Sequence, residues 1–153
     1  MTAEEEALLR KVERLVAAAI LKIQSELKLR RPVAAWDGNQ RVWKLRKRSA
    51  NDPIQVEVLT SIATFPTYSV HPGDIREVEV TITARAWSRE QRYATQERRI
   101  YTKLLKDAGR IPRAEEFEAE LAEALAEADE LAEQLPEAAK RLEPFLTKDI
   151  GKP

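Results

Sequence analysis

Hydrophobic and polar positions recur along the chain with two different periods, and each period predicts its own kind of element. Apolar residues follow a helical spacing over residues 4–29, which predicts a long amphipathic helix that ends before Pro32. Strict alternation of apolar and polar residues predicts strands over 41–47, 54–63 and 75–86. The third of these alternates most regularly, so we expect a sheet with one face in water.

The second half of the chain carries helical signals. Ser88 followed by Gln91 is typical of a capping box and predicts that a helix starts there. Further on, an apolar stripe at helical spacing runs as far as Leu135. Because proline interrupts a helix, Pro136 is expected to separate that helix from a short final one. The predicted C-terminal elements are helices over 89–108, 113–135 and 137–146, followed by a polar tail over 147–153.

Together these elements predict an α+β fold with a long N-terminal helix, a three-stranded antiparallel sheet and two to three C-terminal helices. The chain has 153 residues, a common size for one domain, so we expect residues 1–146 to form a single unit.

The chain contains no cysteine, which excludes disulfides and thiolate chemistry. The acidic start lacks the pattern of a secretory signal, and charges interrupt the first apolar stripe. We therefore expect a cytoplasmic protein.

Candidates for catalysis are few. The only histidine is His71, which lies in a Val-His-Pro-Gly-Asp segment where a surface turn is the ordinary interpretation. One histidine without cysteine gives none of the familiar zinc spacings. The four isolated glycines form neither a phosphate loop nor a dinucleotide fingerprint. We therefore expect no enzyme activity, no metal, no cofactor and no small-molecule substrate.

The formal net charge is zero, but the charges are segregated along the chain. Residues 28–48 hold eight basic residues and one acidic residue, and residues 85–113 hold nine basic and three acidic residues. Residues 114–138 hold ten acidic residues and no basic one. Such segregation favours oriented contacts with a partner or with another copy of the chain.

The basic residues of the predicted helix over 89–108 fall on one side of it, away from the apolar residues. A basic stripe close to aromatic residues suits a phosphate backbone, so one hypothesis is a nucleic-acid-binding module. The alternative is a solvated helix face that the acidic helix of the same or a neighbouring chain neutralises. The residues of the nucleic-acid hypothesis are Arg46, Lys47, Arg48, Arg92, Arg99, Lys103, Lys106 and Arg110.

One run of the sequence, over residues 53–105, combines a proline-initiated strand, a loop, an alternating strand and a serine-capped helix. The residues that carry this run are Pro53-Ile54-Gln55-Val56, Val78-Glu79-Val80-Thr81-Ile82-Thr83-Ala84 and Ser88. The run resembles the core of phage tail terminator and tail completion proteins. The predicted helices over 113–146 depart from that pattern, which returns to a strand. The resemblance implies a virion subunit without catalytic residues that forms a ring at the end of the tail tube, near the head–tail joint.

Charge segregation and resemblance together predict a homo-oligomer that is a ring rather than a two-fold dimer. The acidic helix of one copy would meet the basic strand region of the next, and such unlike surfaces close into rings when the rotation permits. The residues expected at this contact are Glu116, Glu120, Glu123, Glu127, Arg30 and Arg31. The expected partners are copies of the chain and other virion proteins, with weak nucleic-acid contact as the alternative and no membrane contact.

Overall fold

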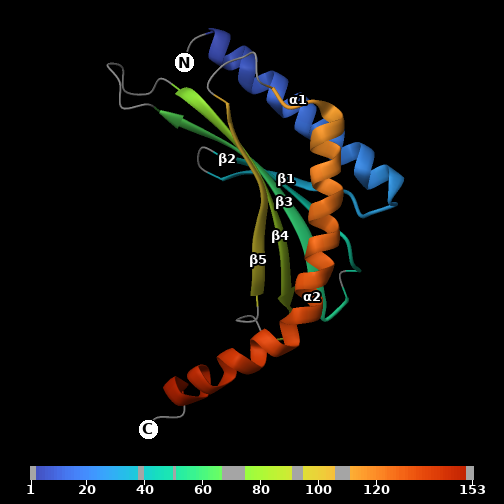
Figure 1. The fold of residues 1–153 in the computed structure, drawn as a ribbon, viewed down its shortest axis with the longest axis vertical. Coiled ribbons are helices and arrows are strands. Elements are labelled where there is room, and N and C mark those ends of the chain that lie inside the picture. Colours follow the sequence, from blue (N-terminus) through green and yellow to red (C-terminus); the bar gives the residue numbers. More distant parts are fainter. Residues whose placement is uncertain are drawn as a thin grey trace.

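The computed structural model describes residues 3–37, 40–49, 51–66, 75–90, 95–105 and 111–150. Within these residues, five antiparallel strands form one sheet and two helices lie on one side of it (Figure 1). The elements in chain order are α1 (Ala3–Glu26), β1 (Val33–Asp37), β2 (Gln40–Arg46), β3 (Ile54–Pro66), β4 (Ile75–Ser88), β5 (Thr95–Leu105) and α2 (Ala114–Ile150). The spatial order of the strands is their order in the sequence, so each strand pairs with its sequence neighbours.

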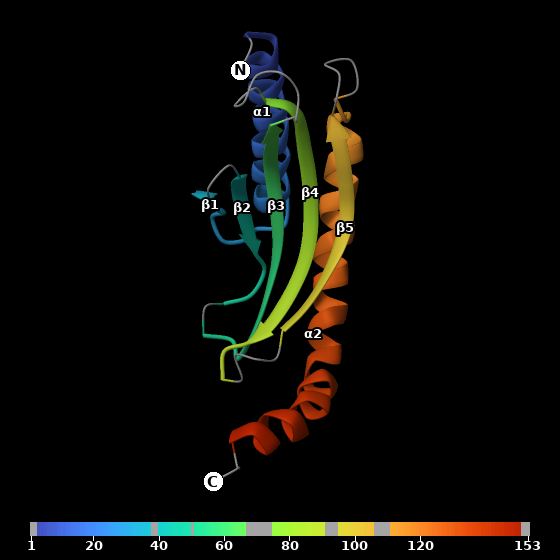
Figure 2. The same ribbon diagram turned by 90° about the vertical axis from the view of Figure 1, so that its left-hand side faces the viewer.

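Only one face of the sheet is covered. Figure 2 looks onto the other face, where the strands lie in front of both helices. Because successive side chains of a strand point to opposite faces, Val58, Val80 and Ile82 are buried beneath the helices while their neighbours lie on the other face of the sheet. The buried core beneath the helices includes Leu8, Val12, Val16, Ile20, Trp43, Leu45, Val58, Ile62, Val80, Ile82, Phe117, Leu121 and Leu125.

Helix α1 ends in a Schellman motif without glycine. Lys28 N–H donates to the Ser25 carbonyl at 3.3 Å, and Leu29 N–H donates to the Gln24 carbonyl at 2.9 Å. These two bonds satisfy carbonyls that the end of a helix leaves without partners. Lys28 is the left-handed residue of the motif, with φ 53°, a conformation in which a Cβ is unfavourable. Lys28, in the connection between α1 and β1, is therefore in a strained backbone conformation.

Helix α2 continues well beyond the part that covers the sheet. Its apolar face begins at Phe117, and Leu135 is its last buried position among the side chains that the structure describes. Leu135 packs against Ile54, at the start of β3. The helix then runs through Pro136 and Pro144 to Ile150, and Figure 1 shows this part bending and projecting past the ends of the strands. A proline removes one backbone hydrogen bond of a helix and so bends it. In α2 the helix continues through both prolines.

The predicted helix over 89–108 is wrong, because residues 95–105 form strand β5 along the edge of the sheet. The register of β5 against β4 shifts between Ile82 and Thr83, which leaves Ile100 as an extra residue in β5. This bulge breaks the alternation of side chains that would have indicated a strand. The segment is also rich in good helix formers, so local propensity favoured the wrong element until pairing with β4 decided it.

The predicted three-stranded sheet with two to three C-terminal helices is therefore corrected in three places. Residues 33–37, for which no strand was predicted, form the edge strand β1, and β5 replaces a helix, so the described residues make five strands. One helix runs through the proline that was expected to divide it. The N-terminal helix and the strands near 41–47, 54–63 and 75–86 lie where they were predicted, within a few residues. No helix in the described part of the chain is long and apolar enough to cross a membrane.

Candidate functional site

Four charged side chains form a row across the uncovered face, one from each of four adjacent strands. The register pairs Arg46 of β2 with Glu57 of β3. Glu57 in turn pairs with Arg85 of β4, and Arg85 pairs with Glu97 of β5. The Glu57 carboxylate oxygens lie 3.6 Å from Arg46 Nε and 3.5 Å from Arg85 Nη1. Arg85 Nε lies 3.3 Å from Glu97 Oε1. The charges alternate along the row, which is the favourable arrangement for directly opposed residues.

Glu57 is the buried member of this row. Its side chain is 2% exposed, although it lies on the face that no helix covers, whereas Arg46 and Arg85 are each about a third exposed. The two long arginine side chains flank the carboxylate and shield it from water. A carboxylate that has lost its water requires positive charge nearby. Glu57 therefore forms ion pairs with two guanidinium groups on the surface of the sheet.

Arginine side chains gather around one indole ring at the end of this face. Arg85 lies over Trp87, with 5.1 Å from the guanidinium carbon to the ring centroid, which is within cation–π range. One shallow depression of about 440 Å³ is lined by Arg85, Trp87, Ser88, Arg89 and Thr95. A second, of about 200 Å³, is lined by Arg30, Arg46, Gln55, Trp87 and Arg89. We name Arg30, Arg46, Arg85, Arg89 and Trp87 the arginine patch.

The turn between β2 and β3 fixes the floor of the arginine patch. Asp52 Oδ1 accepts a hydrogen bond from the Ile54 N–H at 3.0 Å, which is an Asx turn. The buried Gln55 amide donates to two backbone carbonyls of the same turn, at 2.9 and 2.7 Å. Arg89 N–H donates to the Pro53 carbonyl at 2.9 Å, which ties the end of β4 to the turn. The backbone beneath the patch is therefore held by its own hydrogen bonds.

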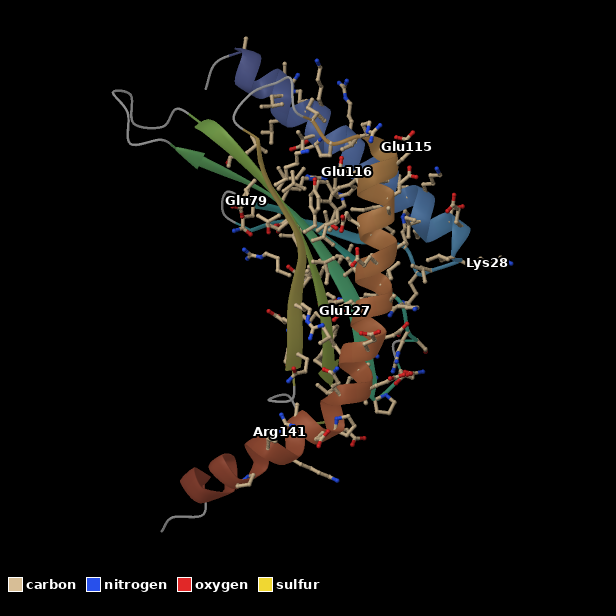
Figure 3. The ribbon with its side chains drawn as sticks, viewed as in Figure 1. Lys28, Glu79, Glu115, Glu116, Glu127 and Arg141 are labelled. Carbon is tan, nitrogen blue, oxygen red and sulfur yellow. The ribbon has the colours of Figure 1, made fainter. Side chains whose placement is uncertain are left out.

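The opposite side of the molecule is acidic. Helix α2 uses three of its carboxylates for pairs within the chain: Lys22 with Glu118, Lys47 and Arg48 with Asp129, and Arg98 with Glu127. The hydrogen bond to Glu118 and the charge of that carboxylate raise the pKa of Lys22. Six other carboxylates of α2 are exposed: Glu115, Glu116, Glu123, Glu130, Glu133 and Glu137. We name these six residues the acidic face of α2, and Figure 3 shows Glu115 on the side away from the sheet.

A small electrostatic conflict lies where α2 begins. Partial burial, followed by the nearby charges of Glu123 and Glu116, raises the pKa of Glu120 above its ordinary value. Burial also raises the pKa of Tyr101 to about 12, and the charges of Glu116 and Glu120 add to this effect. The Tyr101 ring packs edge-on against Phe117, with 6.0 Å between ring centroids. Its buried hydroxyl has no hydrogen-bond partner among the described residues.

The nucleic-acid hypothesis loses the helical stripe on which it was based. Because of the bulge, Arg99 pairs with Thr83, whose side chain faces the uncovered side, whereas Lys103 pairs with Val80, whose side chain faces the helices. These two basic residues therefore lie on opposite sides of β5. Arg92, Lys106 and Arg110 lie outside the described residues, as does His71. Of the predicted set, Arg46 belongs to the arginine patch.

The residues predicted for contacts between copies fall into two groups. Arg30 lies in the arginine patch, and its guanidinium donates to the Arg48 carbonyl at 3.5 Å, while Arg31 is exposed nearby in the chain. Glu116 and Glu123 are exposed on the acidic face of α2, and Glu120 is half-buried beside them. Glu127 faces the sheet, where it meets Arg98.

The fold-back of α2 pairs more of the basic segment than the sequence indicated. The basic strand region was expected to meet the acidic helix of another copy, but Lys47 and Arg48 both reach Asp129 of the same chain. Arg46 of the same segment contacts Glu57 instead. The acidic helix therefore neutralises part of the basic segment within one chain, and two other basic residues of the segment, Arg30 and Arg46, lie in the arginine patch.

The residues of the arginine patch suit the recognition of an anionic group. Among the described residues, no group of three or more histidine, cysteine, aspartate or glutamate side chains is placed to hold a metal ion. The depressions of the arginine patch are shallow, whereas small-molecule sites enclose most of their ligand. Exposed guanidinium groups beside an indole suit a carboxylate or phosphate partner that is presented by a large surface.

No protein-family model matches the chain, and no curated protein or solved structure matches it either.

Sequence reasoning missed Arg85, Trp87 and Arg89 as members of one site. Arg85 and Trp87 belong to the polar side of the predicted strand over 75–86 and its end, which is where an uncovered face was expected. Glu57 occupies the corresponding side of the preceding predicted strand. The signal was therefore present as charges on the polar faces of two strands. The register that places those charges opposite one another could not be obtained from the sequence.

Proposed function

We propose that the protein is a non-enzymatic assembly subunit that associates with copies of itself. The observation that carries this proposal is the projecting part of α2, which extends past the strands to Ile150 (Figure 1). The side chains of Glu137 and Arg141 in this part are 76% and 79% exposed. A structural element that leaves the body of its own domain is a common means of contact between subunits.

Helix physics supports a partner for this projecting part. Isolated helices shorter than about 12–15 residues are marginal in water, because nucleation is costly and most helical stability comes from packing. Two prolines weaken this part further. The sequence nevertheless places Leu142, Phe145 and Leu146 at the spacing that continues the apolar pattern ending at Leu135. A second copy of the chain would supply the surface that such a pattern requires.

The proposed setting is a phage tail, as a terminator or head–tail joining subunit. What supports it is the resemblance of residues 53–105, and its two strand segments are strands β3 and β4 in the structure. The serine-capped helix of that pattern is replaced by β5. The support for the setting therefore rests on α1, β3 and β4, whereas the support for self-association rests on α2.

Sedimentation velocity tests self-association. We expect the wild-type chain to sediment as a concentration-dependent oligomer and the double variant Leu142→Glu with Leu146→Glu to sediment as a monomer. The control is Lys140→Glu, which changes the charge by the same amount at an exposed position of the same helix. Circular dichroism should show folded protein for all three chains. A wild-type monomer at high concentration and low salt would overturn the proposal.

A further inference from the structure

We propose that the outer edge of β1 is a second contact between copies, in which β1 of one copy pairs antiparallel with β1 of another about a two-fold axis. This inference rests on the proposed self-association and adds to it a site that the projecting part of α2 does not supply. It is carried by the difference between the two edges of the sheet, because one edge is protected against strand pairing and the other is not.

Within the described chain, one side of the β1 backbone faces no other strand. Strand β1 is the first in the order of the sheet, and among the described strands it pairs with β2 alone. Figure 2 shows it at the outer end of the sheet, away from α2. In an antiparallel pair, alternate residues turn their N–H and C=O groups towards the partner strand, and the others turn them away. The groups that turn away can bond another strand.

The side chains of β1 leave room for such a strand. Ala34 and Ala35 point to opposite faces of the sheet, and both are exposed, so both faces are open here. Val33 is 45% exposed, and it is one of three large hydrophobic residues that are exposed in the described chain. A second strand beside β1 would cover Val33 and would meet only methyl groups at the two alanines.

The opposite edge of the sheet carries features by which proteins prevent edge pairing. Strand β5 exposes three charged residues in succession, Glu97, Arg98 and Arg99, and its register with β4 shifts at a bulge. Charges and bulges on an edge strand both protect it against pairing with another chain. Strand β1 has neither from Val33 to Trp36, because these residues are uncharged and the register with β2 is continuous. The open edge is therefore that of β1.

A second copy of β1 fits this edge. A two-fold axis makes two identical strands antiparallel, and the backbone groups that one strand leaves open then face the matching groups of the other. With the axis through the middle of the strand, Ala35 faces Ala35 of the partner subunit, and no two like charges lie opposite one another. The contact is isologous, so the same residues are used by both copies.

The contact is too small to join two copies unaided. Five residues of strand extend about 17 Å, whereas a stable interface buries about 1,200 Å² or more. The pairing of β1 therefore adds to the contact made by the projecting part of α2. Because an isologous contact joins only two copies, a larger assembly requires both contacts.

The residue on the two-fold axis provides the test, because it faces its own counterpart. Ala35→Lys and Ala35→Glu each place two like charges directly opposite, so we expect each variant alone to raise the dissociation constant of self-association roughly fivefold in sedimentation velocity. An equimolar mixture should regain wild-type association, because lysine then faces glutamate. The controls are Thr102→Lys and Thr102→Glu, which place the same charges at an exposed position of the protected edge and should associate like the wild type.

A cysteine at the same position reports the register directly. The chain contains no cysteine, so Ala35→Cys adds a single thiol to each copy. Directly opposed residues of antiparallel strands have Cα atoms about 4.5–5.5 Å apart, a separation that a disulfide can bridge. We expect mild oxidation with diamide to produce covalent dimers from Ala35→Cys and not from Thr102→Cys at the same protein concentration.

The outcomes separate this contact from the proposed self-association. If wild type associates while Ala35→Lys and Ala35→Glu associate equally well, the pairing of β1 is wrong and self-association stands; the edge is then open to an extended segment of another protein. Failure of the mixture to recover, or cross-linking of Ala35→Cys no faster than that of Thr102→Cys, would also refute the pairing. A wild-type monomer at high concentration would refute self-association and this contact with it.

Discussion

Removing the charge of Glu57 should destabilise the fold measurably. In the Glu57→Gln variant, Arg46 and Arg85 would each lose the carboxylate that lies 3.6 and 3.5 Å away. Breaking a fully buried ion pair costs about 3–5 kcal/mol. Here the carboxylate is buried but the arginines are about a third exposed, so they can turn towards water and recover part of the loss. We therefore expect a decrease of roughly 1–3 kcal/mol in the free energy of unfolding.

Urea unfolding followed by tryptophan fluorescence measures this decrease. The matched control is Glu97→Gln, which removes the same charge from the same row at a position whose side chain is 54% exposed. Exposed pairs contribute about 0–1 kcal/mol, so the control should change stability little. A double-mutant cycle with Arg85→Gln should give a favourable coupling energy. If Glu57→Gln costs no more than its control, burial does not strengthen the row and the reasoning is refuted.

Three further predictions concern single residues. Lys28→Gly should stabilise the protein by roughly 0.5–1 kcal/mol in thermal or urea unfolding, because glycine adopts positive φ without strain; a loss of stability would contradict the Schellman assignment. Tyr101→Phe should be neutral or stabilising, since it removes a buried hydroxyl without a partner in the described chain, and a cost above about 1 kcal/mol would show that the hydroxyl is bonded. The raised pKa of Glu120 means that the folded state binds its proton more tightly than the unfolded state, so stability falls as pH rises through the window between the two pKa values. Glu120→Gln should therefore be more stable than wild type at neutral pH and should flatten the slope above pH 4, whereas an unchanged slope would refute the shift.

The sequence was informative where burial imposes a clear period. Val78, Val80 and Ile82 alternate with polar residues because β4 lies in the middle of the sheet with one face against the helices. The edge strand β5 has no such period. Its inner side carries Arg98, which meets a glutamate of α2 rather than a hydrophobic core, and Ile100 is an extra residue in a bulge. Both features depend on partners that lie far away in the sequence.

The charges, too, could be predicted only in part from the sequence. That the chain separates basic from acidic segments could be predicted by counting, and the acidic segment forms a helix as expected. Which basic residues the helix neutralises could not be predicted, because the pairing of Arg48 with Asp129 depends on the path of α2 across the sheet. The arginine patch depends on register as well, since Arg46 and Arg85 meet only through Glu57. Long-range geometry therefore determines the site, whereas local pattern determines most of the elements.

The order of the elements along the chain has a consequence for synthesis on the ribosome. The strands pair with their sequence neighbours, so hairpins can form as soon as each strand has left the exit tunnel. Helix α1, which is made first, covers part of the sheet, whereas α2, which packs against β3, β4 and β5, is made after all of them. Until residues 128–132 emerge, Ala84 and Ala86 lack the residues of α2 against which they pack. Each nascent chain therefore passes through an interval in which the part of the sheet that α2 covers is open to water.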